Sequence, residues 1–152
     1  MKEILVIVPC GQRKIWDKHP QKGATPARYV YIGAPFKVNA KYAEAFSKYW
    51  VILSAKYGFI TPEFKILGPY NITFKKKDTN PVSVETLQDQ IRKRGLHNYD
   101  TIVGLGGKEY RQVIEKSFAY FNKKVHFPFA GLPIGKAMQA TKRAIEAGIL
   151  IP

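Results

Sequence analysis

The sequence predicts a single α/β domain over residues 1–152, a three-layer sandwich with a four-stranded, mainly parallel sheet and helices on both faces. Two observations predict this class. Residues 4–8, 50–54 and 101–105 are continuous apolar runs, as expected for strands that are buried on both faces. The segments between these runs carry apolar residues at helical spacing. A chain of 152 residues also fits one domain.

A fourth, weaker apolar run at 125–129 completes the predicted sheet. Strands that alternate with helices are joined by right-handed crossovers, and we expect the four strands in the order 2-1-3-4. Ser83 is an N-cap residue and Gly95 a C-terminal stop for one of the helices. The helical apolar stripes are expected over 38–49, 84–95, 110–121 and 134–148.

The charge balance is strongly basic. Against 11 Asp and Glu the chain has 25 Lys and Arg, which gives a formal net charge of +14 and an isoelectric point near 9.9. A single-sign excess of this size costs self-repulsion in the folded state, so it predicts a polyanionic partner such as nucleic acid. The alternative is that the charge serves solubility alone.

Cys10 is the single cysteine, which excludes an intramolecular disulfide and predicts a reducing, cytoplasmic location. The N-terminal apolar run is too short for the core of a signal peptide. No stretch approaches the roughly 20 apolar residues of a membrane span. We therefore expect no membrane partner, and the sequence leaves the oligomeric state open.

Each predicted strand is followed by a loop of small and polar residues that contains a lysine. Because parallel strands end at one edge of the sheet, where open α/β sheets bind ligands, these loops predict one basic crevice. The alternative is that Gly and Lys are simply common in turns. The predicted contacts to a nucleic-acid backbone are Lys14, Lys108, Gly131, Leu132, Gly135 and Lys136.

The last of these loops invites comparison with a phosphate-binding loop. The Walker pattern needs four residues between its glycines and a Ser or Thr after the lysine. Here three residues separate Gly131 from Gly135, and Ala137 follows Lys136. This departure argues against an ordinary NTPase, although a backbone phosphate would still fit a helix N-terminus. No Cys and His residues have zinc-ligand spacing, so we expect no metal and no cofactor.

The first long loop, 11–35, contains the candidate catalytic residues Gln12 and Asp17, which would position water. Asp17 is the only carboxylate between Glu3 and Glu44, and a loop-capping role is its alternative. Aromatic residues interleaved with cations suit stacking on bases, although several of them must be core. The predicted substrate-binding residues are Cys10, Gly11, Phe36, Lys56, Tyr57, Tyr70 and Asn71. For Cys10 a small packing role is the alternative.

Four segments, Val8–Lys14, Ala27–Gly33, Leu53–Pro62 and Pro69–Asn71, resemble in this order a family of small uncharacterised prokaryotic proteins. That family is related to the YaaA peroxide-stress, DNA-binding proteins and is similar to the amino-terminal domain of archaeosine synthase. The Ser-Ala-Lys-Tyr-Gly run at 54–58 is the most distinctive part. The resemblance implies binding to DNA.

A more distant resemblance is to the uracil-DNA glycosylase fold. That fold has a four-stranded parallel sheet, a Gly-Gln water-activating loop after its first strand and a leucine-bearing loop after its last. Gly11-Gln12 and Leu132-Pro133 stand at these places. No aspartate or histidine follows Gln12 directly, and Ser54 and Lys56 stand where that fold ends its second strand with an asparagine. The resemblance therefore implies the architecture and the position of the groove.

Together these features predict a glycosylase-like protein that hydrolyses the N-glycosidic bond of a modified or damaged base. A flipped base would enter the crevice, and Leu132 would wedge into the vacated stack. Two alternatives stay open. One is a non-catalytic DNA-binding stress-response protein of YaaA type, and the other is an enzyme that acts on a free nucleoside or nucleotide.

Overall fold

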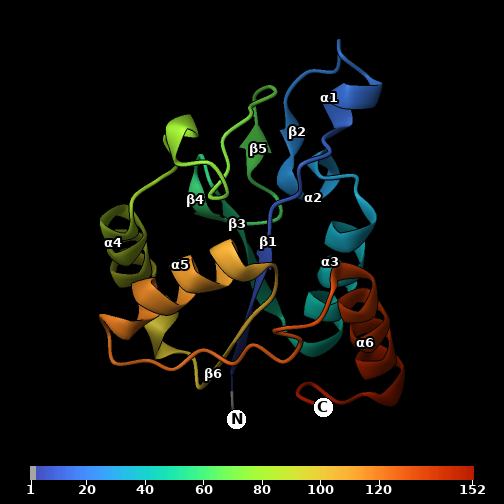
Figure 1. Cartoon of the computed structure of the whole chain (residues 1–152). Helices are drawn as coiled ribbons and strands as arrows, with labels where there is room; N and C mark the ends of the chain where they lie inside the picture. The colour runs from blue at the N-terminus through green and yellow to red at the C-terminus, as the bar shows by residue number, and fades with distance from the viewer. Residues whose placement is uncertain (1–2) are drawn as a thin grey trace.

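The computed structural model describes residues 3–152 and has a four-stranded sheet between two layers of helices, which confirms the predicted α/β class (Figure 1). β1 is central and parallel to both of its neighbours, and the edge strand β4 is antiparallel to β3. The strands are β1 (Ile4–Pro9), β3 (Tyr49–Ser54), β4 (Gly58–Ile60) and β6 (Thr101–Gly104), in the order β4-β3-β1-β6.

The predicted strand at 125–129 is wrong. This segment contributes one isolated parallel bridge, from His126 to Val103 of β6. Pro128 has no N–H to donate to a ladder, so the segment cannot extend the sheet further. The fourth strand is instead β4, which follows β3 through a tight turn and was not predicted.

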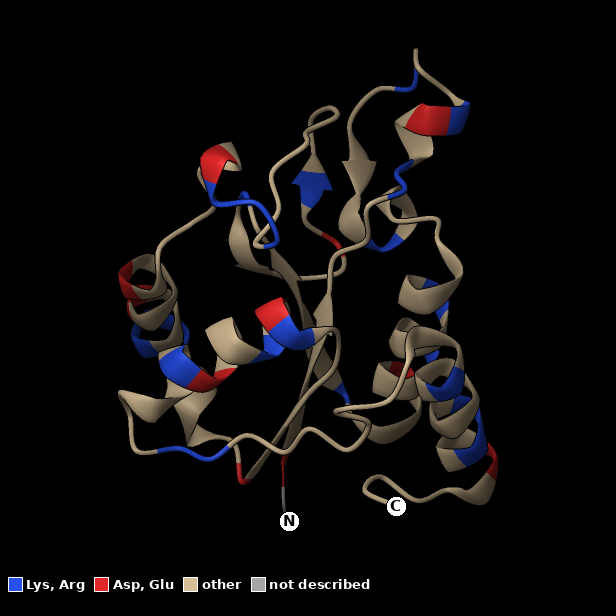
Figure 2. Ribbon diagram, in the orientation of Figure 1, with Lys and Arg blue, Asp and Glu red and all other residues tan. Residues whose placement is uncertain are grey.

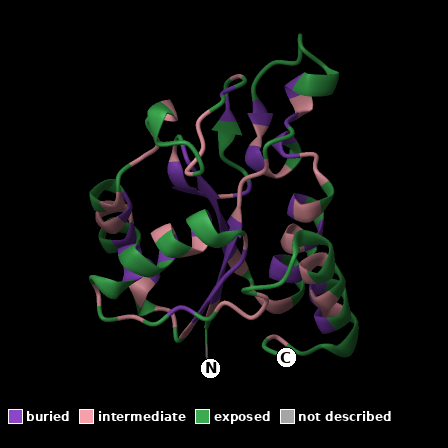
Figure 3. Ribbon diagram, in the orientation of Figure 1, coloured by how far each residue is buried: buried purple, intermediate pink, exposed green. Residues whose placement is uncertain are grey.

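Side chains that alternate along β1 build two separate cores, and most of this strand is coloured as buried in Figure 3. Val6 and Val8 pack in the core on the side of α3 (Ala34–Phe46) and α6 (Ile134–Ala147). Leu5 and Ile7 pack in the core on the opposite side of the sheet, together with residues of α4 (Val84–Arg94) and α5 (Lys108–Ala119). All four of these side chains are fully buried, which explains the continuous apolar run in the sequence.

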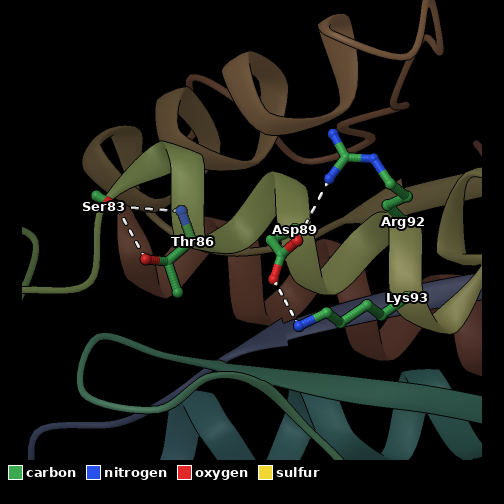
Figure 4. A network of polar contacts seen from close by, with 5 residues as sticks. All are labelled: Ser83, Thr86, Asp89, Arg92 and Lys93. Atoms are coloured by element: carbon green, nitrogen blue, oxygen red, sulfur yellow. Dashed lines mark hydrogen bonds and ion pairs between the residues drawn. The ribbon is translucent and has the colours of Figure 1, made fainter.

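α4 begins and ends where the sequence predicts. The Ser83 hydroxyl accepts the backbone N–H of Thr86 at 3.1 Å, and Gly95 ends the helix with a φ of 65° (Figure 4). Asp89 pairs with Arg92 and Lys93 along the exposed side of the helix. Two other predicted helix bounds need correction, because Tyr49 belongs to β3 and Phe121 lies beyond the end of α5.

α4 also covers the exposed edge of β4. The Gln90 side chain accepts the N–H of Phe59 at 2.8 Å and donates to the carbonyl of Tyr57 at 3.0 Å. Arg94 donates to the carbonyl of Phe59 at 2.7 Å. Gly58 has a φ of 79°, and a β-carbon there would collide with the Gln90 side chain, so this position needs glycine.

The long loop predicted at 11–35 pairs with the segment that follows β4. A two-stranded antiparallel ribbon joins them beyond the carboxyl ends of β1 and β3, at the top of Figure 1. No helix within residues 3–152 is long and apolar enough to cross a membrane. The segments that form this ribbon contain α1 (Ile15–Lys18), β2 (Thr25–Pro26), α2 (Ala27–Val30), β5 (Lys65–Ile66) and the 3-10 helix η1 (Lys77–Thr79). A second 3-10 helix, η2 (Leu96–Asn98), follows α4.

Replacing Phe118 with alanine should lower the free energy of unfolding by about 3–5 kcal/mol, because the ring is fully buried and packs edge-on against Phe59. Tyr120→Ala, two residues further along, removes a ring that is 63% exposed and should cost less than about 1 kcal/mol. Urea unfolding of both variants checks this. Similar losses would contradict the assignment of Phe118 to the core.

Candidate functional site

Three buried hydroxyl groups meet at the carboxyl end of β3. The Tyr70 Oη lies 2.6 Å from the Tyr31 Oη and 2.9 Å from the Ser54 Oγ. We call Tyr31, Ser54 and Tyr70 the hydroxyl cluster. Ser54 is the last residue of β3, and its Oγ also accepts the backbone N–H groups of Lys56 and Tyr57 at 3.2 and 3.1 Å. The same side chain therefore shapes the turn that carries Lys56.

A second set of contacts links the end of β1 to α5. The Cys10 Sγ lies 3.4 Å from the Oη of Tyr110, which is in the first turn of α5. The Thr73 Oγ1 lies 3.5 Å from the same oxygen. Segments that follow β1, β5 and β6 thus meet at one edge of the sheet. Parallel topology places the ends of β1 and β6 at this edge.

Two lysines lie against the ring of Tyr70. Lys14 is buried, and its ammonium group donates to the carbonyl of Gln12 at 3.3 Å and lies 4.5 Å from the ring centroid. Lys56 is exposed, and its ammonium group lies 5.6 Å from the same centroid and 5.2 Å from that of Tyr57. Within residues 3–152, the ion pairs involve only Arg28, Arg92 and Lys93 as cations.

Burial sets the protonation of this region. It lowers the pKa of the Lys14 ammonium, and the smaller effects of Cys10 and Asp17 oppose that change. It also raises the pKa values of Tyr31, Tyr70 and Tyr110, with Cys10 adding to each increase. The three phenols therefore stay neutral at physiological pH and can each donate and accept a hydrogen bond.

The structure brings five of the predicted residues together at the edge: Cys10, Lys14, Lys56, Tyr57 and Tyr70. Lys14, Lys56 and Tyr57 contact the Tyr70 ring. Cys10 contacts Tyr110 instead.

Gly11 and Phe36 lie behind the hydroxyl cluster. A β-carbon at Gly11 would be 3.6 Å from the Cβ of Tyr31 and 3.7 Å from that of Phe36. The Phe36 ring is buried in the core 5.1 Å from the Tyr31 ring, so it supports the cluster from below and does not line an open pocket. Asn71 follows Tyr70 and is exposed.

The predicted catalytic residues are both exposed. The Asp17 carboxylate accepts the backbone N–H of Lys14 at 2.8 Å, at the start of α1. The capping alternative for Asp17 is therefore observed. The backbone carbonyl of Gln12 accepts from the Lys14 ammonium group, and the residue itself is exposed on the surface.

The remaining predicted residues lie between α5 and α6. Lys108 lines a surface hollow of about 260 Å³ together with Arg111, Phe127 and Ala130. Gly131 follows with a φ of 84°, a conformation that favours glycine. The side of the edge near α5 and α6 is open to solvent, and its exposed predicted residues are Gly131, Leu132, Gly135 and Lys136.

A larger hollow of about 560 Å³ lies elsewhere, at Lys18–Lys22 beyond α1, and contains none of the predicted residues. Within residues 3–152 no three His, Cys, Asp or Glu side chains are grouped so that they could hold a metal ion.

Three polar residues of the site were not among the predicted set: Tyr31, Ser54 and Tyr110. Ser54 and Tyr31 stand inside segments that carry the family resemblance, which was a usable signal. Tyr110 sits within an apolar helical stripe, and that pattern predicts a core position and not a polar contact.

The fold and the site define an α/β protein with a basic, phenol-rich edge at the carboxyl ends of a mainly parallel sheet. The chain belongs to the DUF6884 family, described as a family of unknown function, whose model matches residues 5–143. It is similar to the uncharacterized protein YfjM of Bacillus subtilis (strain 168), with 34% identity over 143 residues that cover 93% of this chain and 95% of YfjM. No solved structure matches the chain. These matches do not link it to YaaA, archaeosine synthase or uracil-DNA glycosylase, and those resemblances stay predictions.

Alkaline pH should destabilise the fold through Tyr31 and Tyr70. Their folded-state pKa values lie above the ordinary 10.0, so above that pH the unfolded chain releases protons that the folded chain keeps. Stability that is fully present below about pH 10 is then lost as the pH rises. The double variant Tyr31→Phe/Tyr70→Phe should lose less stability between about pH 9 and 11 in urea unfolding. An unchanged pH dependence would contradict the burial of these phenols.

Proposed function

We propose that this protein binds nucleic acid, DNA preferred, across the carboxyl edge of its sheet. The observation that carries the proposal is the placement of Lys14 and Lys56 against one ring, that of Tyr70, with no carboxylate in an ion pair to either among residues 3–152. Neither ammonium group has a carboxylate as an ion-pair partner, so an anion bound beside them would supply the missing counter-charge. Phosphate is the anion that every nucleotide supplies.

The distribution of charge over the rest of the chain supports the same partner. The chain carries a net charge of +14, and within residues 3–152 the ion pairs use only three of the Lys and Arg side chains as cations. Lys and Arg lie on the loops above the sheet, at the start of α5 and along α6 (Figure 2). A phosphate backbone that follows this edge would meet Lys56 and Lys108, and then the loop from Gly131 to Lys136.

Lys56→Ala should weaken binding to duplex DNA and lower the slope of log affinity against log salt by about 1, since one phosphate contact is lost. Lys48→Ala is the matched control, because it removes the same charge from the opposite end of β3. Fluorescence anisotropy at several salt concentrations measures both. Equal effects of the two substitutions would contradict the proposed edge, and affinity that hardly depends on salt would indicate a small ligand instead.

The second candidate function is hydrolysis of an N-glycosidic bond. It goes together with the proposal that this α/β fold is arranged like that of uracil-DNA glycosylase. Two exposed side chains favour it. Gln12 is on the surface three residues after β1, and Leu132 is 44% exposed just before α6. In this proposal Leu132 would enter the base stack, Gln12 or Asp17 would position water, and nearby phosphates would stabilise the positive charge that develops on the sugar.

Incubation with oligonucleotides that carry modified bases, followed by cleavage at abasic sites, tests this chemistry. We expect Gln12→Ala and Asp17→Asn to abolish turnover and to spare binding. Asparagine keeps a side-chain oxygen that can accept the Lys14 N–H, so the second substitution preserves the cap. Full activity in both variants would contradict these roles, and no strand breaks across a broad panel would favour a non-catalytic DNA-binding protein.

A further inference from the structure

Three aromatic rings form a continuous array beside the lysines of the site. The Tyr57 ring lies 5.2 Å from that of Phe64 in a tilted arrangement and 5.8 Å from that of Tyr70 in an edge-on arrangement, measured between centroids. We call these three residues the aromatic array. They come from one short stretch of chain, from the turn after β3 to the loop after β5.

The array opens to solvent at one end. Tyr70 is buried, Tyr57 is half-buried and Phe64 is 37% exposed. The Lys56 ammonium group lies 5.2 Å from the Tyr57 centroid. An exposed aromatic ring next to an exposed cation is a combination that proteins use to hold a nucleobase by stacking and its phosphate by charge.

The segment that carries Phe64 is held in place before any ligand arrives. The Phe64 carbonyl accepts the N–H of Ala27 at 2.8 Å, and the Pro62 carbonyl accepts that of Arg28 at 2.9 Å. Arg28 also pairs with Glu63 at 2.9 Å, which neutralises the carboxylate beside the ring. A platform fixed in this way costs little conformational entropy when a ligand binds.

The surroundings of the array are apolar and basic together. Tyr29 of α2 is 61% exposed and Leu67 is 78% exposed, and these residues follow the two strands of the antiparallel ribbon, β2 and β5. Lys65 of β5 is exposed as well. These exposed apolar side chains come from α2, which packs against β5, and from the residue after β5. Exposed apolar side chains are typical of a binding surface, and basic side chains beside them favour a polyanion as the ligand.

We propose that the aromatic array stacks on unpaired bases, so that single-stranded nucleic acid is the preferred ligand of this edge. The inference rests on the proposed function and specifies its ligand. In a duplex the faces of the bases are covered by their neighbours, and only an unpaired base offers a face to Phe64 and Tyr57. Duplex DNA would use the lysines alone.

The chain contains a matched control for this proposal. Tyr120 is 63% exposed, its ring lies 5.1 Å from that of Phe121, and the Arg92 guanidinium lies 5.8 Å from its centroid. The same combination of rings and cation thus occurs beyond the end of α5, outside the proposed site. Tyr120→Ala removes it without touching the array.

The experiment compares a short oligothymidylate with a blunt-ended DNA duplex by anisotropy at one salt concentration. The oligothymidylate should bind more tightly. Phe64→Ala should weaken its binding by about 5-fold to 100-fold, the range expected for loss of one stacked base, and leave duplex binding within about 2-fold. Phe64→Trp should restore tight binding, and a 2-aminopurine in the oligonucleotide should lose fluorescence with wild type and not with Phe64→Ala.

Equal affinities for the two ligands would overturn this inference, as would equal effects of Phe64→Ala and Tyr120→Ala. Salt-dependent duplex binding would then persist and leave the proposed function standing. Failure of both ligands to bind would overturn the proposed function as well. Thermal unfolding of each variant, together with the tryptophan substitution, separates a loss of stacking from a loss of folding.

Discussion

Burial of β1 on both faces is the constraint on which the rest of the structure depends. Four consecutive apolar side chains of this strand enter two different cores, so the strand can carry no polar function along its length. Polar chemistry is therefore confined to its end, where Cys10 and Lys14 follow. Because β3 and β6 run parallel to β1, their ends supply Ser54 and Tyr110 at the same edge.

The polar groups at this edge differ in how completely they are satisfied. The hydroxyls of Tyr31, Ser54 and Tyr70 bond to one another, so their burial costs little. Lys14 has only a carbonyl and an aromatic face for its ammonium group, which is a weak substitute for a carboxylate. A buried cation held in this state by the fold gives the edge its affinity for anions in the proposed function.

Continuous apolar runs made β1, β3 and β6 predictable, since each is long enough to dominate its local sequence. The segment at 125–129 has similar composition, but Pro128 limits it to a single bridge. β4 could not be predicted, because its three residues are too few to show the alternating pattern of a strand. The position of the loops at one edge could be predicted from the parallel topology. The hydrogen-bond partners of Tyr31 and Tyr110 could not, because they lie 39 and 100 residues away in the sequence and are brought close by tertiary packing alone.

The side chains of Gln90 and Arg94 also decide how this sheet meets other molecules. They occupy the backbone N–H and carbonyl of Phe59, the groups through which an additional strand would join at β4. An uncovered edge of this kind is a template for intermolecular β-pairing and for aggregation. With α4 in place, growth of the sheet on that side is blocked, so copies of this highly charged chain can lie close together there without joining their sheets.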